Sequence, residues 1–491
     1  MNGAICAYIP LYIKSNSMGE FIFDAEWAQY AQDMHIKYYP KLLCAVPFTP
    51  VSCTKILMSP GLRFMLSQLD MDDYVEEEEN EGIGGGDIVN GNSNSNSNSI
   101  RQGEREFRLL VTKIIKTIAT SNNLSSVHMN FISDEEALDI AGPLPVPNFF
   151  STESEDERED KDDRNDDGNV SNNEENCNGD NNVIDTLNKD EGTNDRSDDG
   201  TNTNNNNSAP IQERVKSVFS RIVKRDNKND LYIRRTSLQY HWLNINRNNH
   251  NLPYTSFDDY LNCFKSKKRI TIKRERRRVL QEQNIIVDAI VGRDIRKYPG
   301  LVERMFEIYK STVDKMFFGR QYLTLEFFQG LVHRDDFIDN LLFMCARYNN
   351  TADDDDNNDN DNYNGEFKAE NIFAGTFNIV KDDVFYGRYW GCLPGYESKN
   401  LHFEVCYWAA IEYCIANNYK RIEPGAGGGD YKWARGFDPQ LIHSAHYISQ
   451  PAFRKAVQQY VQFDSERNIA IAELLNERSA VLKQKTVGKK G

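Results

Sequence analysis

The sequence predicts a mixed α/β protein whose central unit lies at residues 384–447. Side-chain character alternates along residues 384–391, which is typical of a strand with two different faces. The expected first face carries Val384, Tyr386, Arg388 and Trp390, and the expected second face carries Phe385, Gly387, Tyr389 and Gly391. Residues 402–418 are apolar almost all round and predict a buried helix, and residues 420–423 predict a short strand. Such a βαβ unit places polar groups at its strand ends, where open α/β sheets hold their sites.

A glycine-rich loop follows the second strand of this unit. Pro424 restrains Glu423 to an extended conformation at the end of the strand. The glycines that let the backbone turn freely after it are Gly425, Gly427, Gly428 and Gly429. Asp430 is expected to cap a short basic helix over residues 431–436. The loop and this helix therefore bring further polar groups to the same end of the predicted sheet.

The remaining elements are predicted from hydrophobic patterns along the chain. Further strands are expected at residues 3–14, 41–46, 126–131, 230–244, 341–348 and 371–380. Further helices are expected at residues 26–34, 107–120, 298–318, 324–331 and 453–485. Residues 256–259 are typical of a capping box, and the helix that they open is expected to run into residues 265–278, where 9 of 14 side chains are basic. Because the chain begins within a predicted strand, we expect its start to be truncated.

Three low-complexity tracts interrupt this pattern. Residues 72–99, 151–208 and 351–365 are rich in acidic residues, asparagine and serine, and are too poor in apolar residues to order themselves. We expect them to be disordered loop insertions. Residues 151–200 hold 19 acidic and 5 basic side chains, a net charge of −14 that accounts for nearly all of the chain's −16. An acidic fold that repels nucleic acid is therefore not implied.

Cysteine usage indicates a reducing compartment. The nine cysteines are scattered and include no CxxC pair, so neither a disulfide framework nor a zinc site is predicted. The sequence contains no apolar run of about 18 residues, so a membrane span is not predicted. No signal peptide is visible. We expect the cytoplasm or the interior of an organelle, with any targeting segment lying upstream of the given start.

Six separated motifs, taken together and in order, resemble one known family. They lie at residues 10–27, 38–51, 266–277, 386–392, 401–415 and 422–448. They are similar to the FemAB-like "peptidoglycan biosynthesis/recognition" family of GNAT-type N-acyltransferases. The resemblance implies two tandem GNAT-like acyl-CoA N-acyltransferase domains with mixed sheets. It also implies that two strands of the second domain splay apart to admit the acyl donor.

The implied domain boundaries follow the tracts described above. An N-terminal domain, incomplete at its start, covers residues 1–150, the acidic insert covers 151–208, the first domain returns over 209–255, and the second domain covers 256–491. The chain departs from the family at the glycine loop, which reads GAGGGDYK where members show a Gln-Gly-Glu-His-Lys-like run. Residues 393–400 also lack the pyrophosphate-binding loop of ordinary acyl-CoA enzymes. Acyl-CoA is the expected co-substrate, with no tightly bound cofactor, and aminoacyl-tRNA stays open as the donor.

Glu423 is the leading candidate for a general base. A carboxylate at the splayed strand end would take the proton of an attacking amine. The alternative is a structural carboxylate that pairs with a cation across the loop, namely Arg421, Lys432 or Arg435. The resemblance also places the segment around His446 beside the cleft, which makes His446 a second acid–base candidate.

Arg388 is the third catalytic candidate. A guanidinium framed by aromatic rings binds a carboxylate or phosphate, or it forms a structural cation–π stack, and both interpretations stay open. Backbone N–H groups of residues 387–391 are the expected donors to the oxyanion of a tetrahedral transition state. The expected substrate-binding set comprises Tyr386, Gly387, Tyr389, Trp390, Gly391, His402, Glu404, Lys432 and Arg435.

Two further groups of polar residues have both a functional and a structural interpretation. His402 and Glu404, with His443 and His446 on the last strand, match no standard metal-binding spacing, so core histidines are favoured and no metal is predicted. On the basic helix, one face carries Arg269, Lys273 and Arg276. This face suits the phosphates of coenzyme A or of a tRNA backbone, and the alternative is a solvated helix surface.

The sequence therefore predicts an N-acyltransferase that moves an acyl group from acyl-CoA or a similar activated donor to an amine acceptor. The alternative function is a catalytically silent module that binds RNA or another polyanion through residues 265–278. The two differ in how they respond to ligand and salt. Donor-dependent stabilisation at constant salt favours the enzyme, and affinity that collapses with salt favours the module.

Overall fold

The computed structural model describes most of the chain outside the low-complexity tracts. The described residues are 4–22, 24–67, 95–144, 232–315, 321–349, 367–427 and 429–481. All of them belong to one compact unit, Met1–Val146 with Ile222–Gly491. The predicted disordered tracts at 151–208 and 351–365, and residues 72–94 of the first tract, lie outside the described residues. Residues 95–99 were wrongly assigned to that first tract, because they begin a long helix.

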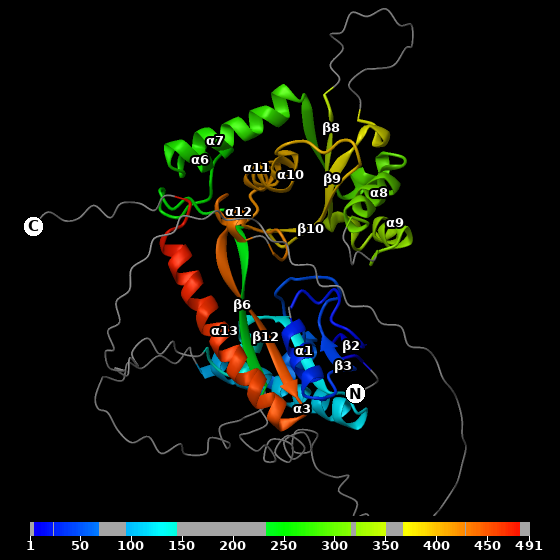
Figure 1. Ribbon diagram of the computed structural model, residues 1–491, viewed down its shortest axis with the longest axis vertical. Coiled ribbons are helices and arrows are strands. Elements are labelled where there is room, and N and C mark those ends of the chain that lie inside the picture. The colour runs from blue at the N-terminus through cyan, green and yellow to red at the C-terminus, as the bar shows by residue number, and fades with distance from the viewer. Residues whose placement is uncertain are drawn as a thin grey trace, which may run out of the picture. The chain divides into compact units, whose positions relative to one another are not determined.

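The predicted mixed α/β fold is confirmed, and a large mixed sheet forms its framework (Figure 1). Within the described residues this sheet has ten strands in the order β2-β3-β5-β12-β6-β11-β10-β9-β8-β7. They are β2 Leu11–Lys14, β3 Lys41–Cys44, β5 Ser126–Ile132, β6 Ile233–Leu243, β7 Ile285–Val291, β8 Leu341–Tyr348, β9 Ala374–Lys381, β10 Val384–Cys392, β11 Arg421–Glu423 and β12 Asp438–Ile448. Strands β3 and β5 are parallel, as are β10 and β11, and the other neighbours are antiparallel. A separate antiparallel pair joins β1 Ala7–Tyr8 to β4 Leu57–Met58.

Helices occupy most of the segments between these strands. They are α1 Ala25–Asp33, α2 Pro60–Ser67, α3 Ser95–Ser121, α4 Asp134–Ala141, α6 Phe257–Asn262, α7 Ser266–Arg277, α8 Leu301–Val313, α9 Leu325–His333, α10 Leu401–Phe403, α11 Ala409–Ala416, α12 Gly429–Trp433 and α13 Pro451–Glu477. The predicted N-cap is confirmed, because the Ser256 side chain accepts a hydrogen bond from the Asp259 N–H. The Asp259 carboxylate accepts from the N–H of Thr255, so the reciprocal bond of a capping box is replaced by one to the preceding residue. The helix that Ser256 opens ends at Asn262, so the basic segment forms a separate helix, α7, rather than its continuation.

Strand β6 joins two halves of the sheet. Its residues from Ile233 to His241 pair with β12, and Trp242 and Leu243 pair with β11. Strand β12 also pairs with β5, and α13 packs on β6 and β12. Strand β12 and helix α13, which lie within the predicted domain over residues 256–491, thus join the half of the sheet that contains β2, β3 and β5. Pairing between segments so distant in sequence leaves no local signal.

A β-bulge in β10 overturns the predicted alternation of that strand. Gly387 lies opposite Asn378 of β9 and Tyr389 lies opposite Phe377, so Arg388 is the extra residue. A bulge of this kind shifts which side chains share a face. As a result, Phe385 and Trp390 pack into one core cluster, although the sequence pattern assigned them to opposite faces.

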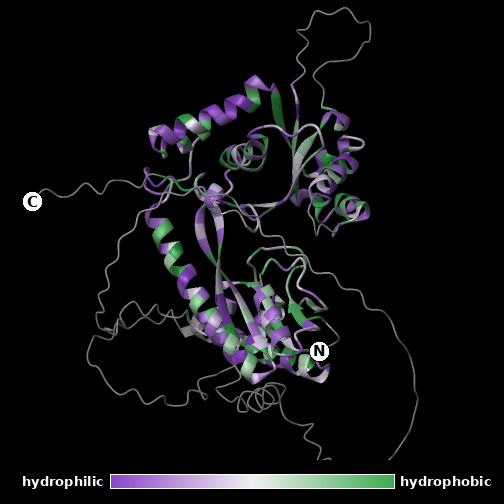
Figure 2. Cartoon of the chain, viewed as in Figure 1, coloured by the Kyte–Doolittle hydropathy of each residue, from purple (hydrophilic) through white to green (hydrophobic). Residues whose placement is uncertain are grey.

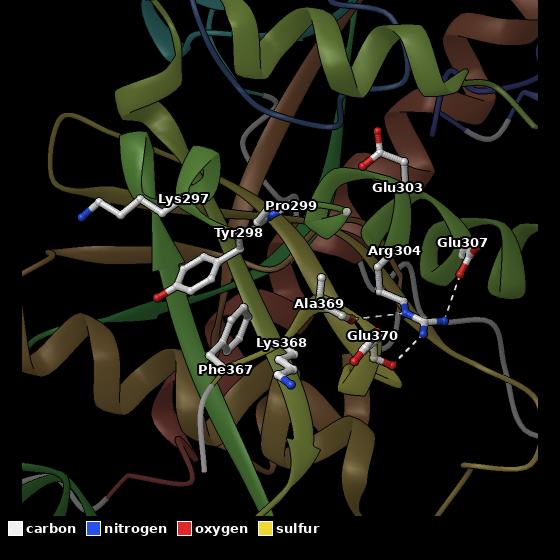
Figure 3. A pocket seen from close by; sticks show the side chains of 11 residues that line it. Lys297, Tyr298, Pro299, Glu303, Arg304, Glu307, Phe367, Lys368, Ala369 and Glu370 are labelled. Atoms are coloured by element: carbon white, nitrogen blue, oxygen red, sulfur yellow. Dashed lines mark hydrogen bonds and ion pairs between the residues drawn. The ribbon is translucent and has the colours of Figure 1, made fainter. Parts of the chain in front are cut away.

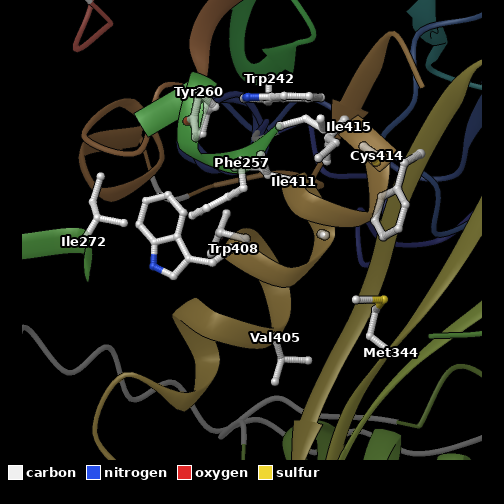
Figure 4. Packing of buried hydrophobic residues seen from close by; sticks show 14 of the residues in the cluster. Trp242, Phe257, Tyr260, Ile272, Met344, Val405, Trp408, Ile411, Cys414 and Ile415 are labelled. Atoms are coloured by element: carbon white, nitrogen blue, oxygen red, sulfur yellow. The ribbon is translucent and has the colours of Figure 1, made fainter. Parts of the chain in front are cut away.

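The predicted buried helix is confirmed and forms the centre of the core next to the site. Residues from Leu401 to Ala416 are helical, with a π-helical turn at Glu404–Trp408 between α10 and α11. Figure 4 shows Trp408 and Ile411 of this helix beside Phe257 and Trp242 of other segments. Figure 2 shows the contrast with α7, which is largely hydrophilic and has Ile272 as its buried residue. The apolar sequence of residues 402–418 therefore reflects burial on several sides.

Helix α8 covers the other face of β9 and β10. A Cβ atom at Gly391 would lie 1.8 Å from the Ile308 carbonyl oxygen, and one at Gly375 would lie 2.5 Å from the Met344 carbonyl oxygen. Because glycine has no Cβ, Gly391 lets β10 approach the backbone of α8, and Gly375 lets β9 approach the backbone of β8. Gly391, predicted to bind substrate, therefore serves helix packing.

Candidate functional site

A pocket opens where the parallel strands β10 and β11 separate. Their pairing begins at Val384 and Arg421 and ends with Tyr386 opposite Glu423. Beyond that point lies a pocket of about 140 Å³. It is lined by Thr376, Asn378, Phe385, Gly387, Arg388, Tyr389, Trp390, His402, Cys406, Tyr407, Ile422, Pro424, Ala426, Tyr431 and Lys432. The predicted residues that it brings together are Gly387, Arg388, Tyr389, Trp390, His402 and Lys432.

Arg388 connects this pocket to a loop of the other half of the sheet. Its guanidinium donates hydrogen bonds to the Phe48 carbonyl oxygen and to the Thr49 hydroxyl, which lies 3.3 Å away. The guanidinium carbon also lies 5.6 Å from the centre of the Tyr389 ring. The structure therefore gives Arg388 a cation–π contact with Tyr389, whereas the sequence pattern placed it on a face with Tyr386 and Trp390. Arg388 reaches the pocket from the bulge, held by neutral groups.

Glu423 lies beside the pocket without lining it. Its carboxylate is buried, and Oε1 lies 2.7 Å from the guanidinium of Arg421. Oε2 has no hydrogen-bond partner among the described residues. Burial raises the carboxyl pKa, and Arg421 offsets only part of this rise. The partner that the structural interpretation required is therefore present, and one oxygen is left to accept a proton.

Besides the charged Arg421, two neighbours of Glu423 are uncharged near neutral pH, the phenol of Tyr386 and the imidazole of His241. Tyr386 lies opposite it on β10, where burial and then the Glu423 charge raise the pKa of the phenol. His241 of β6 lies 4.0 Å from Oε2, too far for a hydrogen bond. Burial, with help from Arg421, lowers the pKa of His241 to about 3. A neutral histidine does not compete with a substrate amine for the carboxylate.

Lys432 is a buried cation in the wall of the pocket. Its side-chain nitrogen donates to the carbonyl oxygen of Gly425 at 2.7 Å and lies 3.5 Å from that of Ala426. Lys432 is 1% exposed, and burial lowers the pKa of its ammonium group to about 8. His402 stands near it with a pKa of about 4, lowered by burial and then by the cations of Arg435 and Lys432. Near neutral pH the ammonium group is therefore charged and the imidazole is neutral.

The structure does not bring His446 to this pocket. Nδ1 of His446 lies 2.8 Å from Nδ1 of His128, and Nε2 lies 2.7 Å from the Ser444 hydroxyl. His446 pairs with Ile233 of β6, whereas His241, the neighbour of Glu423, lies eight residues further along that strand. At about 3.3 Å per residue the separation is about 26 Å. The resemblance placed this segment beside the cleft, but its fully buried imidazole has a core role, and so has His443, whose Nδ1 lies 3.2 Å from the Thr236 hydroxyl.

Glu404 and Arg276, both predicted to bind substrate, bind each other instead. The Nε and Nη2 atoms of Arg276 donate to the Glu404 carboxylate at 2.9–3.2 Å. Nη2 also donates to Glu412 at 2.6 Å, and the guanidinium carbon lies 4.3 Å from the centre of the Phe257 ring. Helix α7 is thereby fixed to the buried helix. Arg276 is thus already engaged by carboxylates and is a poor candidate for binding donor phosphates.

The remaining predicted cations also lie outside the pocket lining. Arg435 packs on Phe403, with its guanidinium carbon 3.4 Å from the ring centre, and it lies 3.4 Å from Glu275. On α7, Lys273 is exposed and lies 3.5 Å from Asp258, and Arg269 donates to the Asn262 side chain at 3.2 Å. A phosphate-binding role for α7 stays a prediction for these last two residues.

Sequence reasoning missed several residues of the pocket wall. Tyr407 and Cys406 belong to the predicted buried helix, and their position on its inner side was not separable from ordinary core packing. Thr376 and Asn378 alternate on β9, where two polar residues within an apolar strand were an available signal. Tyr431 follows the glycine loop, and the sequence pattern predicts for it only a place in the short basic helix.

A larger pocket of about 600 Å³ lies beside the start of α8 (Figure 3). Arg304 occupies its wall and donates to the carbonyl oxygens of Ala369 and Glu370 and to the Glu307 carboxylate. The rings of Tyr298 and Phe367, which also line it, contact each other at a tilt of 58° with their centres 4.4 Å apart. Its prominent cation is already used by neighbouring acceptors, so we assign no chemistry to this pocket.

No group of three or more His, Cys, Asp or Glu side chains that could hold a metal ion occurs among the described residues. Within that part of the chain, no helix combines the length and the apolar character that a membrane crossing requires.

Comparisons with known proteins give a family. The family described as FemAB-like, peptidoglycan biosynthesis/recognition, matches residues 1–83, 205–354 and 363–482. A search of curated proteins found no match.

Similar solved structures cover about half of this chain. L-PGS from Bacillus licheniformis is 7% identical with a TM-score of 0.29, over 48% of this chain and 68% of that one. The C-terminal domain of a putative lysylphosphatidylglycerol synthetase from Agrobacterium fabrum is 10% identical with a TM-score of 0.29, over 46% and 66%. FemX is 10% identical with a TM-score of 0.27, over 47% and 66%.

Proposed function

The chain belongs to the FemAB-like peptidoglycan biosynthesis/recognition family, and from this we propose that it is a transferase that moves an acyl or aminoacyl group from an activated donor to an amine. The observation that carries the proposal is the parting of β10 and β11 immediately after Tyr386 and Glu423. A pocket with polar and aromatic walls opens at that point. We also propose that each half of the sheet belongs to one of two tandem GNAT-like domains.

The proposed chemistry needs a proton acceptor and donors to an oxyanion. Glu423 takes the proton of the attacking amine, directly or through one water, because Oε2 has no hydrogen-bond partner within the described part of the chain and burial raises the pKa of the carboxyl group. Two features support the second requirement. The bulge leaves Arg388 out of the ladder with β9, and the described pairing with β11 ends at Tyr386, so the other edge of residues 387–391 faces the pocket side. The N–H groups of residues 387–391 are the proposed donors to the oxyanion.

The test of Glu423 is the Glu423→Gln variant, which keeps the shape and removes the base. Turnover is expected to fall about 10²-fold or more while donor affinity holds. If Glu423 is only the partner of Arg421, the variant loses stability and its turnover follows the folded fraction. Lys420→Gln is a matched control. Lys420 directly precedes β11, is exposed and pairs with Asp383. Normal turnover per folded Glu423→Gln molecule would refute the base role.

The donor is tested separately. The full chain is incubated with an amine acceptor and either acyl-CoA or aminoacyl-tRNA, and the products are identified by mass spectrometry. Acyl-CoA is the expected co-substrate, and membership of this family makes aminoacyl-tRNA a second donor to test beside it. Transfer from one donor and not the other assigns the donor class. Transfer from neither, with a folded protein, argues against the proposed activity with these donors.

A further inference from the structure

The pocket between β10 and β11 has an unusual charge arrangement. Two of its lining residues are cations, Arg388 and Lys432. None of its described lining residues is an aspartate or a glutamate. The hydrogen bonds described for both side chains go to neutral oxygens, the carbonyls of Phe48 and Gly425 and the Thr49 hydroxyl among them. The pocket therefore carries positive charge without a carboxylate to balance it.

Burying such a cation is energetically costly. A charged group removed from water loses its hydration, and carbonyl dipoles replace only part of it. Two other buried lysines among the described residues are fully engaged. Lys55, 2% exposed, donates to the carbonyl oxygens of Cys53 and Phe131 and to the Cys53 sulfur, and Lys41 is balanced by acids. Lys41, 0% exposed, lies 2.9 Å from Glu20 and 2.6 Å from Asp24. Lys432 is 1% exposed, and the carbonyl oxygens of the glycine loop take the place of such acids. Among the described residues Lys432 therefore has neither an acid partner, as Lys41 has, nor a third acceptor, as Lys55 has, and this indicates that a ligand supplies the remaining partner.

The surroundings of Lys432 favour strong recognition of an anion. Aromatic rings of Trp390, Tyr407 and Tyr431 line the same pocket and exclude water from one side of a bound group. An ammonium group has three donors. One of them is engaged with the Gly425 oxygen at 2.7 Å and a second lies 3.5 Å from the Ala426 oxygen. At least one N–H therefore remains for a ligand.

We propose that this pocket binds an oxyanion, a carboxylate or a phosphate group of a substrate, with Lys432 as its principal contact and Arg388 as the second. The size of the pocket restricts the group. A volume of about 140 Å³ is below the range of about 300–1,000 Å³ typical of pockets that enclose a drug-sized ligand. The pocket therefore holds a charged end of the substrate rather than a whole nucleotide. This inference deepens the proposed transferase function by naming the charge of the substrate group that enters the cleft.

The same charge pattern disfavours one alternative. A free ammonium group, such as the amino group of an aminoacyl donor, would meet two cations and no facing carboxylate in the pocket lining. Like charges at close range in a partly buried site repel strongly. If an aminoacyl group is transferred, its amino group lies outside this pocket or is uncharged.

The test is direct binding of small oxyanions to the full-length chain. Inorganic phosphate and acetate are titrated at constant ionic strength by calorimetry, with the wild type, Lys432→Met and the surface control Lys420→Met. The Lys420 side chain is 80% exposed and pairs with Asp383, so its loss should leave binding unchanged. Lys432→Met should weaken binding at least about tenfold, because a charge-assisted hydrogen bond is removed. Preference for phosphate assigns a phosphate of the donor, and preference for acetate assigns a carboxylate of the acyl group or acceptor.

Stability gives an independent measurement. If Lys432 serves a ligand, Lys432→Met should melt at the same temperature as the wild type or higher, since an unbalanced buried charge is gone. A fall of several degrees would instead make Lys432 a structural support of the glycine loop and overturn the proposal. Absence of binding of both anions to the wild type, or equal binding by wild type and Lys432→Met, would also overturn it. None of these readouts requires turnover, so this inference can fail while the proposed transfer reaction stands, and the reverse.

Discussion

Arg276 offers the sharpest test of how the basic helix is used. Its guanidinium is bound by the buried carboxylate of Glu404, which is 1% exposed. Substituting Arg276 by methionine keeps an unbranched side chain and leaves that carboxylate without a partner. Removing one member of a buried pair costs about 3–5 kcal/mol, and we expect this loss in the free energy of unfolding. Urea denaturation followed by circular dichroism measures it as a lower transition midpoint.

Two companion variants define the origin of the loss. Lys273→Met removes a cation from the same helix, where the pair with Asp258 at 3.5 Å is exposed, and should change stability by less than about 0.5 kcal/mol. Arg276→Met combined with Glu404→Leu removes the unpaired carboxylate as well. Because two apolar residues replace a buried ion pair, the double variant should recover most of the lost stability.

The pH dependence of the Arg276→Met variant has a definite sign. Burial already raises the pKa of Glu404, and loss of Arg276 raises it further. An acid whose pKa is raised in the folded state stabilises the fold when protonated, and this contribution is lost as pH rises. The deficit relative to the wild type should therefore shrink as the pH falls from neutral and Glu404 becomes protonated. A deficit no larger than that of Lys273→Met, or one independent of pH, would refute the structural role of Arg276.

Two further substitutions test the packing of the sheet. Gly391→Ala should cost about 3 kcal/mol or more, since its Cβ would lie 1.8 Å from the Ile308 carbonyl oxygen, whereas Gly61→Ala, with nothing within 4 Å, should be neutral or stabilising; equal effects would contradict the close packing of β10 on α8. His446→Leu should cost about 1–3 kcal/mol because His128 and Ser444 lose a partner, with turnover per folded molecule unchanged; a fall of more than tenfold in that turnover would return His446 to the catalytic candidates.

Local patterns in the sequence were sufficient for the βαβ unit. The strand before the bulge, the buried helix and the strand that ends at Glu423 all follow from short-range periodicity, and the structure has them within a few residues. Proline after Glu423 and the glycines beyond it mark the strand end for a local steric reason. These features placed Gly387, Arg388 and Lys432 at one end of the sheet without any tertiary information.

Features that depend on distant segments could not be predicted in this way. The bulge at Arg388 inserts one residue opposite β9, and nothing in the alternation of residues 384–391 reveals it. Local sequence also does not predict which charged residues become buried. The sequence shows Glu404 and Arg276 as two polar residues 128 positions apart, and only the packing of α7 on the buried helix makes them a pair. Charge patterns on a helix therefore predicted a ligand site where the fold uses a salt bridge.

Strand β6 explains why the two halves of the sheet must be considered together at the site. Its Gln239 side chain donates to the Pro50 carbonyl oxygen at 2.9 Å, and its His241 stands beside Glu423. The loop that contains Pro50 also supplies the oxygens that hold Arg388 at the pocket. The position of the Arg388 guanidinium therefore depends on the position of that loop. Residues of the first half of the sheet therefore help to set the charge of a pocket whose lining comes from the second, which a search for catalytic motifs within residues 256–491 would overlook.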